Sequence, residues 1–327
     1  MNLICDLNKI YSRGITGNGI TTAVFDTGIY PHRAFSGPEN KIKVFKDFVN
    51  GEAEPYDDNG HGTHVGGLIA GYDKGFSKMK NMGIYRGRCP GMAPESGLVV
   101  FKVLDSRGNG KMKTMIRAID WLIKHYKNYG VRIVNISVGM PLDEKGDPQQ
   151  EILLKKVEQL WDLGLLVIVA AGNEGPGPYT VTVPGISRKV VTVGAYEPER
   201  AGNKPGKKHY SGCGPVPGTC VCKPDVIAPA SGILSCNNSR DGYVRRSGTS
   251  MAAPIVSGVA ALLLSDNPRL TNLDIKIRLM ETSRDLGLPR NQQGWGLIDP
   301  PELLSTGADQ GNSKDPHRSR RQTGNRY

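Results

Sequence analysis

The chain has 327 residues, of which 38% are hydrophobic and 42 are glycines, and its formal net charge at pH 7 is +11. This composition suits a loop-rich globular enzyme, and the absence of a run of about 18 consecutive apolar residues argues against a transmembrane helix. The positive charge favours acidic partners, but the sequence contains none of the recognised nucleic-acid-binding motifs, so specific nucleic-acid binding is not expected.

Residues 1–14 form a short N-terminal extension without the basic and apolar regions of a secretory signal, which predicts a cytoplasmic protein with no membrane segment. Residues 2–11 are also a candidate for a segment that blocks a cleft. At the other end, residues 305–327 are polar and basic, without apolar residues at helical or strand spacing, and are expected to be disordered.

Five short apolar runs predict strands buried on both faces, because they are nearly continuous and rich in β-branched residues. They cover residues 20–25, 98–104, 133–137, 165–170 and 190–195. Helical patterns lie between and after them, at residues 115–126, 152–161, 250–264 and 274–283. This alternation predicts an α/β fold whose mostly parallel sheet carries helices on both faces.

Polar side chains follow the predicted strands at the edge where open parallel sheets bind ligands. Asp26 and Ser137 end two strands, and Asn173 lies just beyond a third. Ser250 instead opens a helix, among small residues that leave its hydroxyl accessible. All the candidate functional residues are therefore expected at one edge of the sheet.

Ser250 is a candidate nucleophile. Considered without the other residues, a serine at the start of a helix is equally well explained as an N-cap. A nucleophilic serine needs a base and an acid that orients the base. His61, between two glycines, and Asp26 supply these groups, in the chain order Asp-His-Ser. Asn173 follows a buried strand, and its amide is suited to donate to a tetrahedral oxyanion.

Four blocks in this order resemble the subtilase family of serine proteases: Asp-Thr-Gly at 26–28, His-Gly-Thr-His at 61–64, Ala-Ala-Gly-Asn at 170–173 and Gly-Thr-Ser-Met-Ala-Ala-Pro at 248–254. The resemblance covers residues 15–304. It implies one subtilisin-like three-layer catalytic domain and a serine endopeptidase that works through an acyl-enzyme intermediate. It further implies that Asp26, His61 and Ser250 form the catalytic triad, that Asn173 stabilises the oxyanion, and that His64 is structural.

The resemblance also implies polypeptide substrates bound as an extended strand. Substrate-binding positions are then expected on two walls of a cleft and beside the oxyanion site, at Gly108, Gly110, Ser137, Val138, Gly139, Ala171 and Gly172. Glu174 adds negative charge near this site and favours a basic side chain on the acyl side of the scissile bond.

The chemistry requires no metal or cofactor. Many subtilases carry structural calcium, but residues 71–90 are rich in lysine and poor in acids, and no ligand set is identifiable. The Asp57-Asp58 pair suits either a hard cation or a solvated turn. The spacing of four cysteines is not that of a typical zinc site: Cys213, Cys220, Cys222 and Cys236. This spacing favours reduced thiols over a disulfide or a metal site.

Two other functions remain open. One is a catalytically silent peptide-binding relative, although such a protein usually lacks a triad member. The other is a processing protease dedicated to one precursor, with the same chemistry as a general protease. The sequence does not indicate an oligomeric state.

Overall fold

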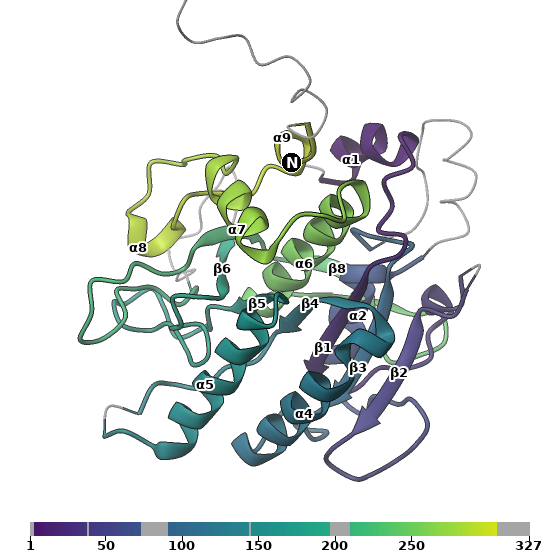
Figure 1. Cartoon of the computed structure of the whole chain (residues 1–327), viewed down its shortest axis with the longest axis horizontal. Helices are drawn as coiled ribbons and strands as arrows, with labels where there is room; N and C mark the ends of the chain where they lie inside the picture. Colours follow the sequence, from purple (N-terminus) through teal and green to yellow (C-terminus); the bar gives the residue numbers. More distant parts are fainter. Residues whose placement is uncertain (1–2, 38, 73–90, 144, 197–209, 306–327) are drawn as a thin grey trace, which may run out of the picture.

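A computed structural model describes residues 3–37, 39–72, 91–143, 145–196 and 210–305 (Figure 1). Seven parallel strands form one sheet in the order β2-β3-β1-β4-β5-β6-β7. The predicted parallel α/β sheet is confirmed, with an additional strand at each edge. The strands are β1 (Thr21–Asp26), β2 (Ile42–Asp47), β3 (Gly97–Lys102), β4 (Val131–Ile136), β5 (Leu166–Ala170), β6 (Val191–Tyr196) and β7 (Val226–Pro229).

Helices cover both faces of the sheet and make the fold three-layered. α2 (His61–Ala70) and α6 (Thr249–Asp266) pack on one face, and α4 (Met112–His125) and α5 (Pro148–Asp162) on the other. Successive strand residues point to opposite faces, so Ile168 joins the core around α6 while Val169 joins the core under α4 and α5. This two-sided burial explains why the strands are almost uniformly apolar.

Helix α6 runs through the centre of the molecule. Among the described helices it alone is long and apolar enough to cross a membrane, yet 83% of its apolar window is buried inside the protein. It is therefore the helix around which the core packs. Pro254 lies in its second turn. Because proline has no N–H, the carbonyl of Ser250 lacks its helical partner there.

The N-terminal helix α1 (Leu3–Ser12) packs beside the C-terminal helix α9 (Pro300–Ser305) (Figure 1). Leu7, Ile10 and Tyr11 are buried in the core that surrounds α6, and the Tyr11 hydroxyl donates to the carbonyl of Met92 at 2.8 Å. The suggestion that residues 2–11 block a cleft is therefore wrong for the described part, because the apolar face of α1 is used in the core.

The remaining described elements lie outside the main sheet, and α7 (Asn272–Glu281) adds Ile275 and Leu279 to the core around α6. A hairpin of β8 (Ile233–Cys236) and β9 (Tyr243–Arg246) lies against α2. Cys213 and Cys236 are buried, and Cys220 and Cys222 are exposed. Most of the 71–90 segment and the predicted disordered tail lie outside the described residues. The short helices are η1 (Arg33–Phe35), η2 (Tyr126–Tyr129), α7 (Asn272–Glu281) and α8 (Arg290–Gln293).

Candidate active site

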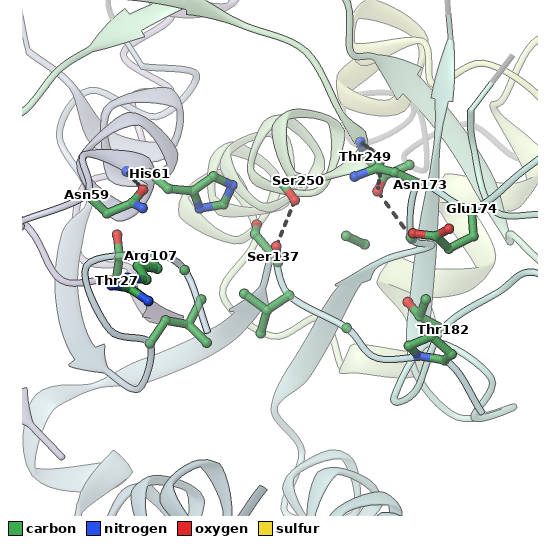
Figure 2. Close-up of a pocket in the computed structure, with 17 residues that line it drawn as sticks. Thr27, Asn59, His61, Arg107, Ser137, Asn173, Glu174, Thr182, Thr249 and Ser250 are labelled. Atoms are coloured by element: carbon green, nitrogen blue, oxygen red, sulfur yellow. Dashed lines mark hydrogen bonds between the residues drawn. The ribbon is translucent and has the colours of Figure 1, made fainter. Parts of the chain in front are cut away.

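The carboxyl ends of three neighbouring strands bring the candidate residues together. Asp26 is the last residue of β1, Ser137 directly follows β4, and Asn173 lies just after β5. Because β1, β4 and β5 are adjacent and parallel, these ends share one edge of the sheet. Ser250 reaches the same edge from the first turn of α6, as Figure 2 shows.

Asp26 and His61 form a buried pair. The imidazole Nδ1 of His61 lies 2.7 Å from Oδ1 of Asp26, a side chain with no solvent exposure. An Nδ1–H that donates to this carboxylate leaves Nε2 as a proton acceptor. Burial lowers the pKa of His61, but the charge of Asp26 and its hydrogen bond together outweigh burial and raise the pKa above 6.5.

A close backbone approach places His61 beside Asp26. A Cβ atom at Gly62 would lie 2.1 Å from the carbonyl oxygen of Gly28, so only glycine fits at this contact. The amide of Gly62 also donates to Oγ1 of Thr27 at 2.9 Å. The turn after β1 is thus held against the first turn of α2, which carries the histidine.

Asp57 stabilises the same junction. It is 4% exposed, and its two oxygens accept hydrogen bonds from the Thr27 hydroxyl, the backbone of Asn59, Gly60 and Thr63, and the Thr63 hydroxyl. These hydrogen bonds outweigh burial and lower the pKa of Asp57. Its charge lies beside the first turn of α2, where a helix favours anions. The sequence showed Asp57 only as part of an acidic pair that suits either a hard cation or a solvated turn.

The hydroxyl of Ser250 faces the end of β4. Its Oγ donates to the carbonyl oxygen of Ser137 at 2.8 Å and not to His61 (Figure 2). The imidazole of His61 points toward Ser250 from the opposite side, so rotation about the Cα–Cβ bond of Ser250 turns Oγ toward the base. The β4 end is itself tied to α6, because Asn135 donates to Oγ of Ser137 at 2.8 Å and accepts from Ser257 at 2.9 Å.

Asn173 is oriented by Thr249, the residue before Ser250. Its Oδ1 accepts from the backbone N–H of Thr249 at 3.0 Å and from the Thr249 hydroxyl at 3.1 Å. Since the oxygen is engaged in this way, the NH₂ group is left as the donor for a ligand. Asn173 and His61 lie on opposite sides of Ser250 in Figure 2. This arrangement suits an acyl carbon at Ser250 with its oxygen directed to Asn173.

His61, Asn173 and Ser250 line a cleft of about 370 Å³. Of the predicted substrate-binding residues, Gly108, Ser137, Val138, Gly139 and Gly172 line it. Gly110 lines a neighbouring apolar cavity of about 220 Å³. Ala171 is fully buried behind the wall, with its amide and carbonyl bonded to Val193 and Thr182, and Ala170 lines the cleft in its place.

The cleft has further lining residues that sequence reasoning did not assign to it. Glu174 was predicted only as a charge near the site, and it lines the cleft itself. Thr182 had no recognisable signal, because it lies in sequence inside an ordinary run of β-branched residues. The additional lining residues are Thr27, Asn59, Leu104, Arg107, Pro141, Glu174, Thr182 and Thr249.

His64 has a structural position, as the sequence suggested. Its side chain is fully buried, and Nε2 donates to the carbonyls of Ile233 at 3.1 Å and Val244 at 3.2 Å. Burial lowers the pKa of His64 to about 4. A neutral histidine therefore joins α2 to the β8–β9 hairpin.

The Asp57-Asp58 pair does not form a cation site. The oxygens of Asp57 accept protein hydrogen bonds, and Asp58 pairs at 2.7 Å with the fully buried ammonium of Lys102. Lys102 also donates to the carbonyls of Thr27 and Leu104, which holds the ends of β1 and β3 together. In the described part of the chain, no three His, Cys, Asp or Glu side chains are grouped closely enough to hold a metal ion.

The subtilase family model matches residues 17–296. The chain belongs to the subtilase family. It is 36% identical to serine protease AprX of Bacillus subtilis (strain 168) over 93% of this chain, and 32% identical to subtilisin Savinase of Lederbergia lenta over 88% of it. The chain spans 64% of the length of AprX but 91% of Savinase. The crystal structure of a cold adapted subtilisin-like serine proteinase superposes with a TM-score of 0.65 at 29% identity, covering 87% of this chain and 88% of that chain.

Proposed function

We propose that this subtilase is a serine endopeptidase that hydrolyses peptide bonds through an acyl-enzyme intermediate. The observation that carries the proposal is the geometry around Ser250. A histidine paired with a buried aspartate lies on one side of the hydroxyl, and an oriented amide donor lies on the other. These are the base and the oxyanion donor that acyl transfer requires.

The reaction proceeds in two halves. Nε2 of His61 takes the proton of Ser250 as Oγ attacks the scissile carbonyl, and Asp26 stabilises the imidazolium that forms. The NH₂ of Asn173 and the backbone N–H of Ser250 bind the developing oxyanion. His61 then gives the proton to the leaving amine, and water hydrolyses the ester by the reverse roles. In subtilisin, losing the asparagine donor costs about 10²–10³ in kcat.

The substrate is a polypeptide bound as an extended strand. Gly108 lies on one wall of the cleft and Ser137–Gly139 on the other. In the described chain the backbone of Gly139 has no hydrogen-bond partner, which leaves its N–H and C=O for a peptide. Alternate side chains of the peptide enter the active-site cleft and the apolar cavity next to it.

A fluorophosphonate probe tests the nucleophile. Wild-type protein should be labelled covalently at Ser250, and Ser250→Ala should not be labelled because the attacking oxygen is gone. Ser247→Ala is a matched control, since Ser247 is an exposed serine three residues earlier in the chain, outside the cleft lining. Labelling that survives Ser250→Ala would refute the assignment, and an unlabelled wild type would favour a silent peptide-binding relative.

A dedicated processing role is separable from general proteolysis by cleavage of a diverse peptide library. Cleavage at one motif would indicate dedicated processing, whereas cleavage at many sequences would indicate general proteolysis. The cytoplasmic location remains a prediction from the sequence.

A further inference from the structure

The segment that leads into β7 carries two cysteines that the proposed function does not use. Cys220 and Cys222 are both exposed, and only Val221 separates them. Exposure alternates along this segment, because Val221 is half-buried and the next residue, Lys223, is only 1% exposed. Such alternation places the two cysteines on one outward face of an extended segment.

Hydrogen bonds within the loop hold the main chain between the two cysteines. The carbonyl of Val221 accepts from the N–H of Val216 at 2.9 Å, and the N–H of Val221 donates to the Thr219 hydroxyl at 3.1 Å. At the base of the loop, the N–H of Gly214 donates to the carbonyl of Lys223 at 2.8 Å. The two cysteines are therefore kept as neighbours without any contact from the rest of the cleft.

Lys223 anchors the end of this segment in the core. Its ammonium pairs with Asp225 at 2.6 Å and donates to the carbonyl of Val190 at 3.1 Å. Cys222 is therefore fixed beside a buried residue, while Cys220 lies toward the exposed tip of the loop.

Two cysteines at this separation can close a disulfide, but not a relaxed one. Each residue of an extended chain adds about 3.3 Å, so Cα atoms two residues apart are about 6.6 Å from each other. This separation is near the upper end of the range for disulfides, about 4.4–6.8 Å, and a strained bridge is easily reduced. A zinc ion is a poorer occupant because it takes four ligands, and within the described ranges no third His, Cys, Asp or Glu side chain joins the pair.

We propose that Cys220 and Cys222 form a redox-active dithiol that low-molecular-weight disulfides close reversibly. The thiolate of one cysteine attacks a sulfur of the reagent, whose S–S bond breaks and releases one thiol. The other cysteine then attacks the protein-side sulfur of the mixed disulfide, which forms the Cys220–Cys222 bond and releases the second thiol. Two protein thiols are oxidised, one disulfide is reduced, and both protons end on the released thiols.

The test treats the full chain, as the inactive Ser250→Ala parent to prevent autolysis, with oxidised glutathione at about pH 8. After alkylation of the remaining thiols, tandem mass spectrometry of the fragment with residues 213–222 should show a Cys220–Cys222 bond. Cys220→Ser and Cys222→Ser should each retain bound glutathione, at least about tenfold more than the parent, because the thiol that displaces it is missing. Excess reduced glutathione should restore both thiols of the parent.

Cys213 is the internal control in the same fragment. It is buried, and burial raises the pKa of its thiol, so it should remain unmodified in every variant. Four outcomes would overturn the proposal: no loop disulfide in the parent, equal glutathione retention in the parent and the serine variants, a dimer linked through either cysteine, or a bridge that excess reduced glutathione does not open. Because the parent lacks Ser250, none of these results bears on the proposed endopeptidase activity.

Discussion

At the scale of single residues, the site depends on one buried carboxylate that controls one imidazole. Asp26 is inaccessible to solvent, and its Oδ1 accepts from His61 and from the backbone of Thr27. Burial alone would lower the pKa of His61, so the upward shift comes from Asp26. The base is active only when neutral, and activity should therefore fall as the pH drops through a value above 6.5.

Replacing Asp26 tests this control. Asp26→Asn removes the charge, so the pKa of His61 should fall and the acid limb of the pH profile should move to lower pH. The rate should also drop about 10⁴-fold, because an amide no longer selects the Nδ1–H tautomer. Rate constants of fluorophosphonate labelling from about pH 5 to about pH 8 measure both effects. An acid limb that does not move would contradict the role of Asp26.

At the scale of elements, α2 is held from two directions. Its first turn is bound by Asp57 and by the turn after β1, and His64 joins it to the β8–β9 hairpin. The hairpin leads directly to Ser250, so this histidine connects the helix that carries the base to the segment that carries the nucleophile.

His64 should make stability depend on pH. The pKa of His64 is about 4 in the folded protein but 6.5 for an unperturbed histidine, so the unfolded state binds more protons between these values. The stabilisation is complete above pH 6.5 and is lost as the pH falls toward 4, by about 2 kcal/mol from pH 7 to pH 5. Urea unfolding of His64→Gln in the inactive Ser250→Ala background should lack this part of the pH dependence.

His125→Gln is the matched control for His64, since His125 is a half-buried histidine on α4, outside the cleft lining. Its unfolding should follow the pH dependence of the Ser250→Ala parent. If His64→Gln also retains that dependence in full, His64 does not titrate as proposed.

At the scale of the whole molecule, the two ends of the described chain lie side by side, away from the candidate active site. α1 packs beside α9 and contributes to the core around α6, the helix that carries Ser250 in its first turn. The N-terminal helix therefore supports the scaffold and leaves the cleft open.

Leu7→Ala tests this structural role. Leu7 is fully buried, so its truncation should lower the free energy of unfolding by about 2–5 kcal/mol. The labelling rate constant of the folded protein should not change. Lys9→Ala, at an exposed position on the same helix, should leave both quantities unchanged. A faster labelling rate in Leu7→Ala would instead support a helix that restrains the site.

The sequence by itself determined the strand pattern, the edge that carries the chemistry and the three catalytic candidates. These depend on local signals: continuous apolar runs, the residues that follow them, and small residues around Ser250. Ser137 and Asn173 were placed by the same reasoning, because parallel neighbours must end at one edge. Which strands lie next to each other depends on contacts between residues far apart in the sequence. The edge strands β2 and β7 were therefore not predicted.

Only the tertiary structure decided which segments close over the site. Thr182 is 43 residues from Gly139 (182 − 139), and the two lie against each other only because two loops meet. Three other features depend on packing in the same way. Ala170 lines the cleft where Ala171 was predicted to do so, both oxygens of Asp57 accept hydrogen bonds, and α1 packs into the core. A strand's periodicity assigns side chains to a face, but the contact that each side chain makes depends on what packs against that face.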